Sequence, residues 1–456
     1  MIIGKQNKNL VNFYKKNVPA FQKDQRDLTH LLENNNVKYG PWTLSFEMAP
    51  AILNNSDAEL IKSAVEKTVR GAELLTNLIL KSPKKWREHF EWNDDFFELA
   101  LVNPGYSYNI PCSRFDIFYS NGFLKFVELN TDGCSGMTNA DLFHKNYMEI
   151  IGRHPELKLE NFEPVYVVPH LIETLLSCYE EFISNFPESN LPKQPLIGIL
   201  DLAGEDTSWE FESVAHHLEK AGFKTKIITP EQAEFNGEKL LFAGEEIHLI
   251  YRRLLGTDYA DKMELLSPVT EAFIKRKVCM VGAPRSQFPF SKKFFAFLQD
   301  SEIQKNFDEE ICDAINQFIP WTRIFREDKT QFNNEKIDLV NFVRDNQELF
   351  VLKPCESKCG YGIFQGKFME QTDWNDSINT TLKKDYIVQE FINLPNENFP
   401  RLLPNKKNEL RYIHLGGYSF GGKFSGVLGR TCANPLLTLI HGERLLPVLC
   451  DKGDIK

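Results

Sequence analysis

The clearest helical pattern of the chain lies near its start. Between Asp57 and Ser82 apolar residues recur every three or four positions, and Asn54 to Asp57 precede them as a cap. The aromatic-rich stretch from Trp86 to Leu101 is helical in part, before Asn103-Pro104-Gly105 breaks the pattern. This pattern predicts an N-terminal helical region over residues 1–100.

An alternating pattern of strands and helices begins after Pro192. The apolar run Leu196–Leu202 has the length and composition of a buried parallel strand. Helix Ser208–Ala221 and the apolar strands Lys224–Thr229 and Ile247–Tyr251 follow it. The alternation predicts a small Rossmann-like unit over residues 193–290. The turn after its first strand is acidic and lacks the glycines of a dinucleotide-binding loop, so we expect the nucleotide elsewhere.

The last segment, residues 291–456, begins as helix and continues as strands. Helical patterns cover Ser291–Phe318 and Leu339–Asp345. Glycine, proline and asparagine separate the β-rich stretches that follow, which are Phe350–Lys353, Ile363–Gly366, Tyr386–Glu390, Arg411–Leu415 and Gly426–Leu428. The fold class expected for the whole chain is therefore α/β (α+β), with residues 101–192 forming a hairpin followed by helices.

The hairpin lies between Ser113 and Asp132, where two alternating strands flank Asn121-Gly122. A two-residue turn pairs Ser120 with Phe123 and, by regular alternation, places Asp116 and Glu128 on opposite faces. A three-residue turn with Gly122 in the left-handed conformation instead pairs Tyr119 with Phe123. It also pairs Arg114 with Glu128.

The three-residue turn gives the more coherent pair of faces, and we predict that register. One face is then apolar, interrupted only by Lys125, and carries Phe115, Ile117, Tyr119, Phe123, Val127 and Leu129. The other face carries Arg114, Asp116, Glu128 and Asn130. Carboxylate and amide oxygens are suitable Mg²⁺ ligands, so Asp116, Glu128 and Asn130 are candidate metal ligands. Arg114 is a candidate for neutralising a transferring phosphoryl group, and a solvated hairpin face is the alternative.

A candidate nucleotide site follows the strand Phe350–Pro354. Lys353 near the strand's end supplies a positive charge, and the glycine-containing loop from Ser357 through Gly360 to Gly362 allows close backbone approach to phosphates. The alternative is an ordinary glycine-bearing hairpin. Lys384 just before the next strand, and Gln389 and Glu390 within it, are further nucleotide candidates, with a solvated lysine as the alternative for Lys384. Arg411 and Arg430 lie on later strands, where they either line the same cleft or are surface residues.

Together these motifs resemble the glutathionylspermidine synthase-like group of circularly permuted ATP-grasp ligases. The matching segments are Arg114-Phe115-Asp116, Glu128 to Asp132, Lys293, the strand from Val351 to Pro354 with its glycine loop, and Gln389. The resemblance implies a permuted ATP-grasp fold with a Rossmann-like pre-ATP-grasp domain, in which the metal strand precedes the nucleotide lysines. It covers about residues 100 to 140 and 196 to 450, leaving the N-terminal helices unmatched.

The resemblance also implies roles for individual residues. Asp116, Glu128 and Asn130 would hold Mg²⁺, while Lys293, Lys353 and Gln389 would bind ATP. Arg114 and Arg430 are the catalytic candidates. Tyr251-Arg252-Arg253, followed by Ala283-Pro284, looks like a substrate strand of related proteins, although a strand-end salt bridge is the alternative. The substrate candidates are Tyr251, Arg252, Asp132, Ser135 and Arg411.

Composition and charge narrow the class of protein further. The formal net charge of −10 disfavours a nucleic-acid partner. No run reaches membrane-spanning length and Lys5, Lys8, Lys15 and Lys16 interrupt the start, so we expect a cytoplasmic protein. The nine cysteines are scattered and read as reduced thiols, and Cys355 and Cys359 lack the partners of a zinc site.

The function expected from these residues is ATP- and Mg²⁺-dependent ligation of a carboxylate to an amine through an acyl phosphate, releasing ADP and phosphate, on a small amino acid, peptide or polyamine substrate. Two alternatives remain on the same fold. One is a phosphotransferase that acts on a hydroxyl, and the other is an ATP-binding or peptide-binding protein without turnover. The sequence carries no signal for the oligomeric state or for the identity of the two substrates.

Overall fold

The computed structural model describes residues 7–204, 208–356, 360–403, 407–434 and 442–451. Its N-terminal half contains helices α1 (Asn7–Lys16), α2 (Val18–Asn34), α3 (Asn55–Lys81), α4 (Pro83–Trp86), α5 (Asp94–Leu101), α6 (Met137–Ile151), α7 (Val168–Asn185) and α8 (Ser208–Lys220). Helices α9 (Gly256–Asp261), α10 (Ser267–Ile274), α11 (Gln287–Phe290), α12 (Lys293–Leu298), α13 (Ser301–Gln304), α14 (Glu309–Phe318), α15 (Leu339–Asp345) and α16 (Gln371–Thr381) follow.

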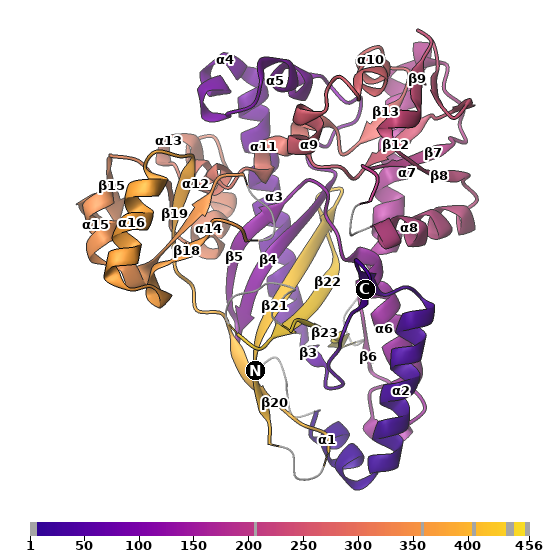
Figure 1. Ribbon diagram of the computed structural model, residues 1–456, viewed down its shortest axis with the longest axis vertical. Helices are drawn as coiled ribbons and strands as arrows, with labels where there is room; N and C mark the ends of the chain where they lie inside the picture. The colour runs from indigo at the N-terminus through magenta and orange to yellow at the C-terminus, as the bar shows by residue number, and fades with distance from the viewer. Residues whose placement is uncertain (1–6, 205–207, 357–359, 404–406, 435–441, 452–456) are drawn as a thin grey trace.

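The centre of the molecule is a six-stranded antiparallel sheet built from distant parts of the chain. Its path is β23-β22-β21-β4-β5, with β20 paired to β21. Strands β4 (Cys112–Ser120) and β5 (Phe123–Asn130) come from the first third of the sequence. Strands β20 (Asn396–Phe399), β21 (Glu409–Phe420), β22 (Lys423–Cys432) and β23 (Arg444–Leu446) come from its end. The two groups lie side by side in the middle of Figure 1.

Helix α3 covers one face of this sheet. Its apolar residues Ile61, Val65 and Val69 share a buried core with Phe115 and Ile117 of β4. The helix begins as predicted, because the Asn54 side chain accepts a hydrogen bond from the Asp57 N–H at 2.9 Å. The opposite face of the sheet is therefore the one left to carry polar chemistry.

A second unit is built around a four-stranded parallel sheet of order β13-β12-β7-β8. Its strands are β7 (Ile197–Leu200), β8 (Thr225–Ile228), β12 (Leu249–Arg252) and β13 (Cys279–Val281). All three strand pairs are parallel, and β13 was not among the strands expected from the sequence. An antiparallel insertion of β9 (Ala233–Phe235), β10 (Leu240–Phe242) and β11 (Glu245–Glu246) separates β8 from β12.

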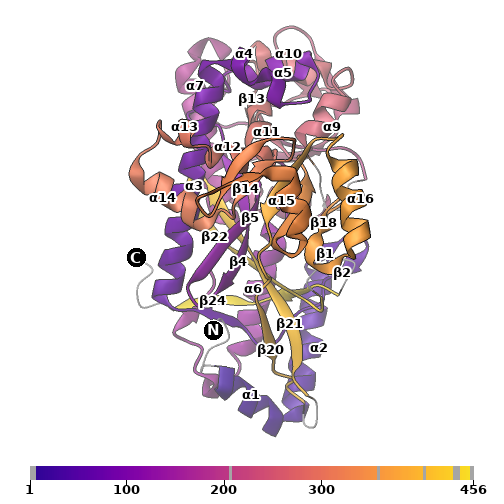
Figure 2. The ribbon, with the colours of Figure 1, turned by 90° about the vertical axis from the view of Figure 1, so that its left-hand side faces the viewer.

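A third, smaller unit contains the candidate nucleotide strands. The sheet order is β14-β19-β17-β18, with β14 (Thr322–Ile324), β17 (Phe350–Pro354), β18 (Phe364–Gln365) and β19 (Tyr386–Glu390). Helices α15 and α16 pack on it around a separate core that includes Trp374 and Phe350. The hairpin β15 (Lys329–Phe332) and β16 (Glu335–Asp338) adjoins this unit. Figure 2 shows the unit in front of the upper end of the central sheet.

The N-terminal region is more than helical. Besides α1 and α2, it contains a hairpin of β1 (Lys38–Tyr39) and β2 (Trp42–Thr43), and strand β3 (Ala51–Leu53). Strand β3 pairs in parallel with β24 (Val448–Asp451), which in turn pairs with β6 (Phe162–Glu163). Segments from the first and the last part of the sequence therefore form one three-stranded sheet, of order β3-β24-β6.

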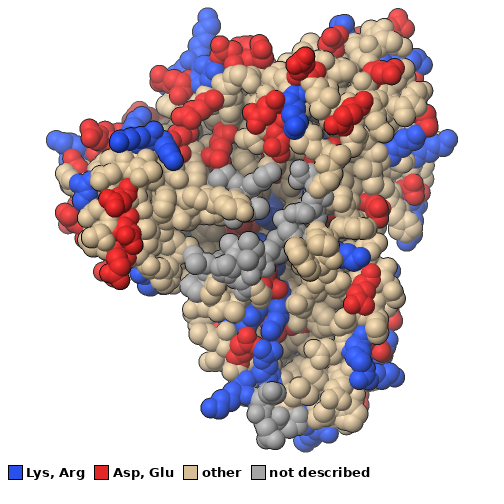
Figure 3. Space-filling model, in the orientation of Figure 1, with Lys and Arg blue, Asp and Glu red and all other residues tan. Residues whose placement is uncertain are grey.

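The surface is hollowed where the smaller unit meets the rest of the molecule, on the face drawn in Figure 3. Acidic and basic side chains are intermixed over that face, without a large patch of one sign. Among the described helices, none is both long and apolar enough to cross a lipid bilayer.

Candidate functional site

The turn of the β4–β5 hairpin differs from the prediction. Ser120 pairs with Phe123, and Asn121 and Gly122 have φ angles of 48° and 81°. Two consecutive residues with positive φ form the two-residue turn favoured by Asn-Gly. The predicted three-residue turn is therefore wrong.

A β-bulge compensates for the shorter turn. Ile117 pairs with Phe126, whereas the neighbouring Asp116 pairs with Glu128, so Val127 is an extra residue in β5. Beyond the bulge every β5 side chain is displaced by one position. Asp116 and Glu128 consequently lie directly opposite each other and share a face of the sheet.

The predicted polar face is thus confirmed, although the predicted register is wrong. Arg114 pairs with Asn130 beside the Asp116–Glu128 pair. The apolar face differs in two positions: Phe123 is 49% exposed and Val127 is not buried. Between Arg114 and Asn130 the buried residues of the hairpin are Phe115, Ile117, Tyr119, Leu124, Phe126 and Leu129.

Asp116 lies in a cluster of basic side chains. The Arg114 Nε contacts its Oδ1 at 3.1 Å, and the Nε2 of His414 on β21 lies 3.7 Å from its Oδ2. Burial opposes ionisation, but Arg114, His414 and Arg430 together lower the pKa of Asp116 to about 2. Asp116 is therefore an anion at neutral pH, as a metal ligand requires.

His414 was not predicted from the sequence. It is 3% exposed, and its Nδ1 lies 2.7 Å from the Arg430 Nη2. Because Arg430 has only donors, Nδ1 must accept, which leaves the proton on Nε2. Burial and the Arg430 charge lower the pKa of His414 to about 3, so the imidazole is neutral.

Glu128 and the candidate nucleotide lysine Lys353 are neighbours. The Lys353 ammonium donates to the carbonyl of Val127 at 3.0 Å and to the Gln389 Oε1 at 2.7 Å. Burial, with a smaller contribution from Lys292, lowers the pKa of Lys353 to about 8, while Glu128 and Asp116 oppose the shift. The structure therefore brings the metal candidates of one end of the chain to the nucleotide candidates of the other.

The two adjacent lysines at the start of α12 differ in their surroundings. Lys292 pairs with the Glu128 Oε1 at 2.9 Å, next to the candidate metal site. Lys293, the predicted ATP ligand, pairs instead with the Asp385 Oδ1 at 2.6 Å and donates to the carbonyl of His89 at 2.8 Å. Lys292 is thus the lysine that faces the carboxylates, and the sequence motif did not distinguish between them.

The remaining nucleotide candidates lie in the glycine loop and at the two ends of β19. Gly360 and Gly362 have φ angles of 73° and 74°, which glycine adopts readily. The Tyr386 hydroxyl donates to the Gly362 carbonyl at 3.1 Å, which ties the loop to β19. Lys384 is exposed just before that strand, and Glu390 ends it. Ser357 lies outside the described residues.

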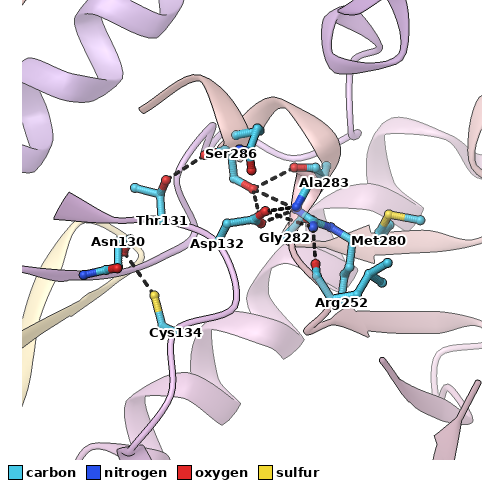
Figure 4. A network of polar contacts seen from close by, with 12 residues as sticks. Asn130, Thr131, Asp132, Cys134, Arg252, Met280, Gly282, Ala283 and Ser286 are labelled. Carbon is cyan, nitrogen blue, oxygen red and sulfur yellow. Dashed lines mark hydrogen bonds and ion pairs between the residues drawn. The ribbon is translucent and has the colours of Figure 1, made fainter. Parts of the chain in front are cut away.

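The substrate candidates Arg252 and Asp132 form a buried ion pair instead of facing a cavity. Figure 4 shows the Arg252 guanidinium bonded to both carboxylate oxygens of Asp132, to the Gly282 carbonyl and to Ser286. Both side chains are almost inaccessible to solvent. Arg252 therefore forms the salt bridge that was the alternative to substrate binding. The Arg252–Asp132 ion pair connects β12 of the parallel sheet to the segment that follows β5.

Two other substrate candidates are similarly enclosed. Tyr251 is buried, and its hydroxyl accepts from the Arg253 Nη1 at 3.1 Å. Arg411 is 1% exposed and donates to the carbonyl of Gly442 at 2.8 Å, with Glu47 3.4 Å from its Nε. Both side chains are therefore enclosed, whereas Tyr251 was expected in a strand beside the substrate and Arg411 in the wall of the nucleotide cleft.

Ser135 has a different position, because it lines a pocket together with Arg114 and Arg430. We call this the Arg114 pocket. The Arg114 Nη1 donates to the Ser135 carbonyl at 3.0 Å, so one guanidinium connects the pocket with Asp116. The charged residues that line it are Lys38, Arg114, Glu210, Arg430, Glu443 and Arg444.

The donor set suits Mg²⁺. Asp116 and Glu128 offer carboxylate oxygens, and the Asn130 amide nitrogen donates to the Arg114 carbonyl at 3.4 Å, which leaves its oxygen available. Within the described residues no group of three or more His, Cys, Asp or Glu side chains is arranged to hold a metal ion, so the candidate site offers two carboxylates and one amide. Hard oxygen ligands without thiolate or imidazole favour Mg²⁺ over zinc.

Comparison with known proteins places the fold in a class. No protein-family model and no curated protein sequence matches the chain. A solved structure that is similar is the apoform of a glutathione synthetase-like effector from Globodera pallida, with a TM-score of 0.59 and 14% identity. The match covers 93% of this chain and 96% of that one. The chain therefore has a glutathione synthetase-like fold, and the likeness extends over most of the N-terminal region.

Two further solved structures match more weakly. One is a proposed γ-glutamylcysteine synthetase from Methylobacillus flagellatus KT, with a TM-score of 0.40, 13% identity and coverage of 82% and 86% of the two chains. The other is a carboxyaminoimidazole ribonucleotide synthase from Aspergillus clavatus complexed with ATP, with a TM-score of 0.24, 10% identity and coverage of 56% and 69%.

Proposed function

We propose that this protein is an ATP-dependent carboxylate-amine ligase of the circularly permuted ATP-grasp type, related to the glutathionylspermidine synthase-like group. The observation that carries the proposal is the contact between Lys353 and the bulged strand β5. Through this contact the Lys353 ammonium, also hydrogen-bonded to Gln389, reaches the part of β5 next to Glu128, the partner of Asp116, although β5 lies more than two hundred residues earlier in the chain. The glutathione synthetase-like fold supports the proposal independently.

In this proposal Asp116, Glu128 and Asn130 hold Mg²⁺, which supplies charge neutralisation at the phosphates of ATP. Lys353, Gln389 and the glycine segment through Gly362 bind the nucleotide, and Lys292 replaces Lys293 as the lysine directed at the phosphates. The unoccupied hydrogen-bonding capacity of Lys353 beyond its two protein acceptors suits a phosphate oxygen. The substrate carboxylate occupies the Arg114 pocket.

The proposed reaction has two steps, phosphoryl transfer from ATP to the substrate carboxylate and attack of an amine on the acyl phosphate. A carboxylate oxygen of the substrate attacks the γ-phosphorus, the bond to the β–γ bridging oxygen breaks, and ADP leaves. An amine then attacks the acyl phosphate carbon, inorganic phosphate leaves with the bonding electron pair, and the proton lost by the new amide nitrogen passes to the departing phosphate. Arg114, shared between Asp116 and the pocket, stabilises the negative charge of the transferring phosphoryl group. The protein acts mainly by positioning and charge neutralisation.

The test is ADP release with Mg²⁺ and ATP over a panel of amino acids, short peptides and polyamines, followed by mass spectrometry of the product. Amide formation with ADP and phosphate is the expected result. Release of AMP and pyrophosphate contradicts an acyl phosphate mechanism. A phosphorylated product without a new amide would identify the phosphotransferase alternative, and absence of turnover with retained ATP binding would identify the non-catalytic one.

The cellular setting belongs to the same proposal. We expect a cytoplasmic protein acting on small molecules, without a nucleic-acid or membrane partner. Fractionation of cells that express the full chain with a fluorescent tag would test the location.

A further inference from the structure

Strands β21 and β22 add two side chains to the polar face of the β4–β5 hairpin. His414 on β21 pairs with Arg430 on β22, so both side chains leave the sheet on the same face. Gly416, two positions further along β21, pairs with Asp116 of β4. Because side chains alternate along a strand, His414 and Gly416 share that face, and the imidazole lies diagonally beside the Asp116 carboxylate.

The absence of a side chain at Gly416 leaves room around this carboxylate. A Cβ at that position would lie 3.0 Å from the Arg114 Cδ, so even alanine would press on the arginine side chain. With glycine there, the Arg114 Nε reaches the Asp116 Oδ1 at 3.1 Å. The other carboxylate oxygen, Oδ2, lies 3.7 Å from the His414 Nε2. Each oxygen of this candidate metal ligand therefore faces one protein donor.

The His414 ring is held on its remaining sides. Its Nδ1 accepts a hydrogen bond from the Arg430 Nη2 at 2.7 Å, and the Arg430 Nη1 pairs with Glu443 at 3.0 Å. The Phe118 ring meets the imidazole edge to face, with 6.1 Å between the ring centres. Because Nδ1 accepts, the proton is on Nε2. Within the described residues this buried Nε2 has no hydrogen-bond partner, and the Asp116 carboxylate is the acceptor that it faces.

We propose that His414 is a positioning residue for Mg²⁺ and acts through Asp116. Its Nε2–H closes on the Asp116 Oδ2 when the metal is bound, while Arg114 holds Oδ1, so that the carboxylate presents a fixed edge for coordination. Hydrogen bonds in such sites are often long before the ligands bind and tighten in the complex. The inference rests on the proposed function, because it takes Asp116 as a ligand of Mg²⁺.

The neutral form of His414 suits this role. Arg114 and Arg430 already place two positive charges near Asp116. An imidazolium would add a third positive charge and oppose the binding of a divalent cation. The hydrogen bond from Arg430 requires an unprotonated Nδ1, so the same contact that orients the ring leaves it one neutral donor, at Nε2.

The test separates the two ring nitrogens by substitution. His414→Gln keeps an N–H near the position of Nε2, His414→Asn keeps a polar group only near the position of Nδ1, and His414→Phe removes both while it retains a ring. Calorimetry measures the binding of a non-hydrolysable ATP analogue to each full-length variant, once in Mn²⁺ and once in excess EDTA. The ratio of the two affinities is the metal-dependent gain.

His414→Phe and His414→Asn are expected to lower the metal-dependent gain about tenfold, whereas the affinity in EDTA stays unchanged. His414→Gln should retain most of the gain. His144→Phe is the matched control, because the Nε2 of this buried histidine accepts from the Val448 N–H at 3.0 Å, outside the candidate metal site. It should lower the unfolding midpoint without changing the metal-dependent gain.

The positioning role is overturned if His414→Phe leaves the metal-dependent gain unchanged. It is equally overturned if His414→Gln loses as much of the gain as His414→Phe, or if His414→Asn retains as much as His414→Gln. No gain in the wild type, or a gain that survives Asp116→Asn, refutes the proposed metal site itself. The expected pattern of variants without ADP release from any substrate mixture refutes the ligase and supports the positioning role.

Discussion

Binding of ATP at alkaline pH should be accompanied by proton uptake at Lys353. In the free protein the pKa of this buried ammonium is lowered to about 8, so about half of the molecules carry the proton at pH 8. A bound triphosphate favours the charged form and moves the pKa back toward the ordinary value of 10.5. ATP binding should therefore take up about half a proton per molecule at pH 8 and only about a tenth at pH 7.

Isothermal titration calorimetry in buffers of different ionisation enthalpy measures this uptake. Lys353→Met should abolish the Lys353 contribution and weaken ATP binding, whereas Lys383→Met, at an exposed lysine before β19, should retain both. The difference between wild type and Lys353→Met isolates the protein's contribution from protons released by ATP itself. Equal uptake in the two proteins would refute the placement of Lys353 at the phosphates.

The same shift has a consequence for stability. Because the folded-state pKa of Lys353 lies below 10.5, the unfolded chain binds more protons between pH 8 and 10.5. The free energy of unfolding therefore gains up to about 3 kcal/mol from this group as pH rises through that window, and the gain is lost as pH falls back to 8. Denaturant titrations of wild type and Lys353→Met across this range should diverge accordingly. Burial of Lys353 thus costs stability at neutral pH, as expected of a binding residue.

The other predictions concern the metal face, the α12 lysines and the buried ion pair. Glu128→Gln should reduce turnover by about 100-fold or more while ATP binding in excess EDTA stays unchanged, and retained Mg²⁺-dependent turnover would contradict the metal assignment. Lys292→Met should weaken ATP binding, whereas Lys293→Met should mainly lower the unfolding midpoint; the reverse outcome would restore Lys293 as the nucleotide ligand. Arg252→Met should destabilise the fold by about 3–5 kcal/mol in denaturant titrations, because it leaves a buried carboxylate unpaired. The double variant Arg252→Met/Asp132→Leu should recover most of that loss, unless Arg252 has another role.

The sequence predicted best those elements whose pattern is local. Helix α3 follows its apolar repeat and its Asn54 cap, and α15 and β19 have the predicted bounds. The single helical pattern predicted over Ser291–Phe318 is divided into α12, α13 and α14 in the structure. Where one of these helices ends depends on contacts with other parts of the chain, which periodicity does not contain.

The hairpin shows why the site could be predicted while its register could not. Regular alternation offers Phe123 and Val127 as the inward residues, or Leu124 and Phe126, but not a change from one set to the other within β5. The bulge at Val127 makes that change, and its carbonyl is bound by Lys353, 226 positions away. A contact so distant in sequence leaves no local signal. The three-residue turn put both carboxylates on one face. That face is the one observed, but the turn and the register that led to it are wrong.

His414 and Lys292 were missed for a related reason. Neither belongs to a spaced motif, and each gains its place through partners in distant strands, Asp116 and Arg430 for His414 and Glu128 for Lys292. A lone histidine in an apolar strand reads as a core residue. An adjacent pair of lysines offers no basis for preferring one over the other, because the helix that orients them begins between them.

The most direct measurement is a crystal structure with Mn²⁺ and a non-hydrolysable ATP analogue, in which the anomalous signal locates the metal. The account predicts an anomalous peak about 2.2 Å from carboxylate oxygens of Asp116 and Glu128, with triphosphate density between that peak and the Lys353 ammonium. A nucleotide bound elsewhere, or a peak away from both carboxylates, would contradict it.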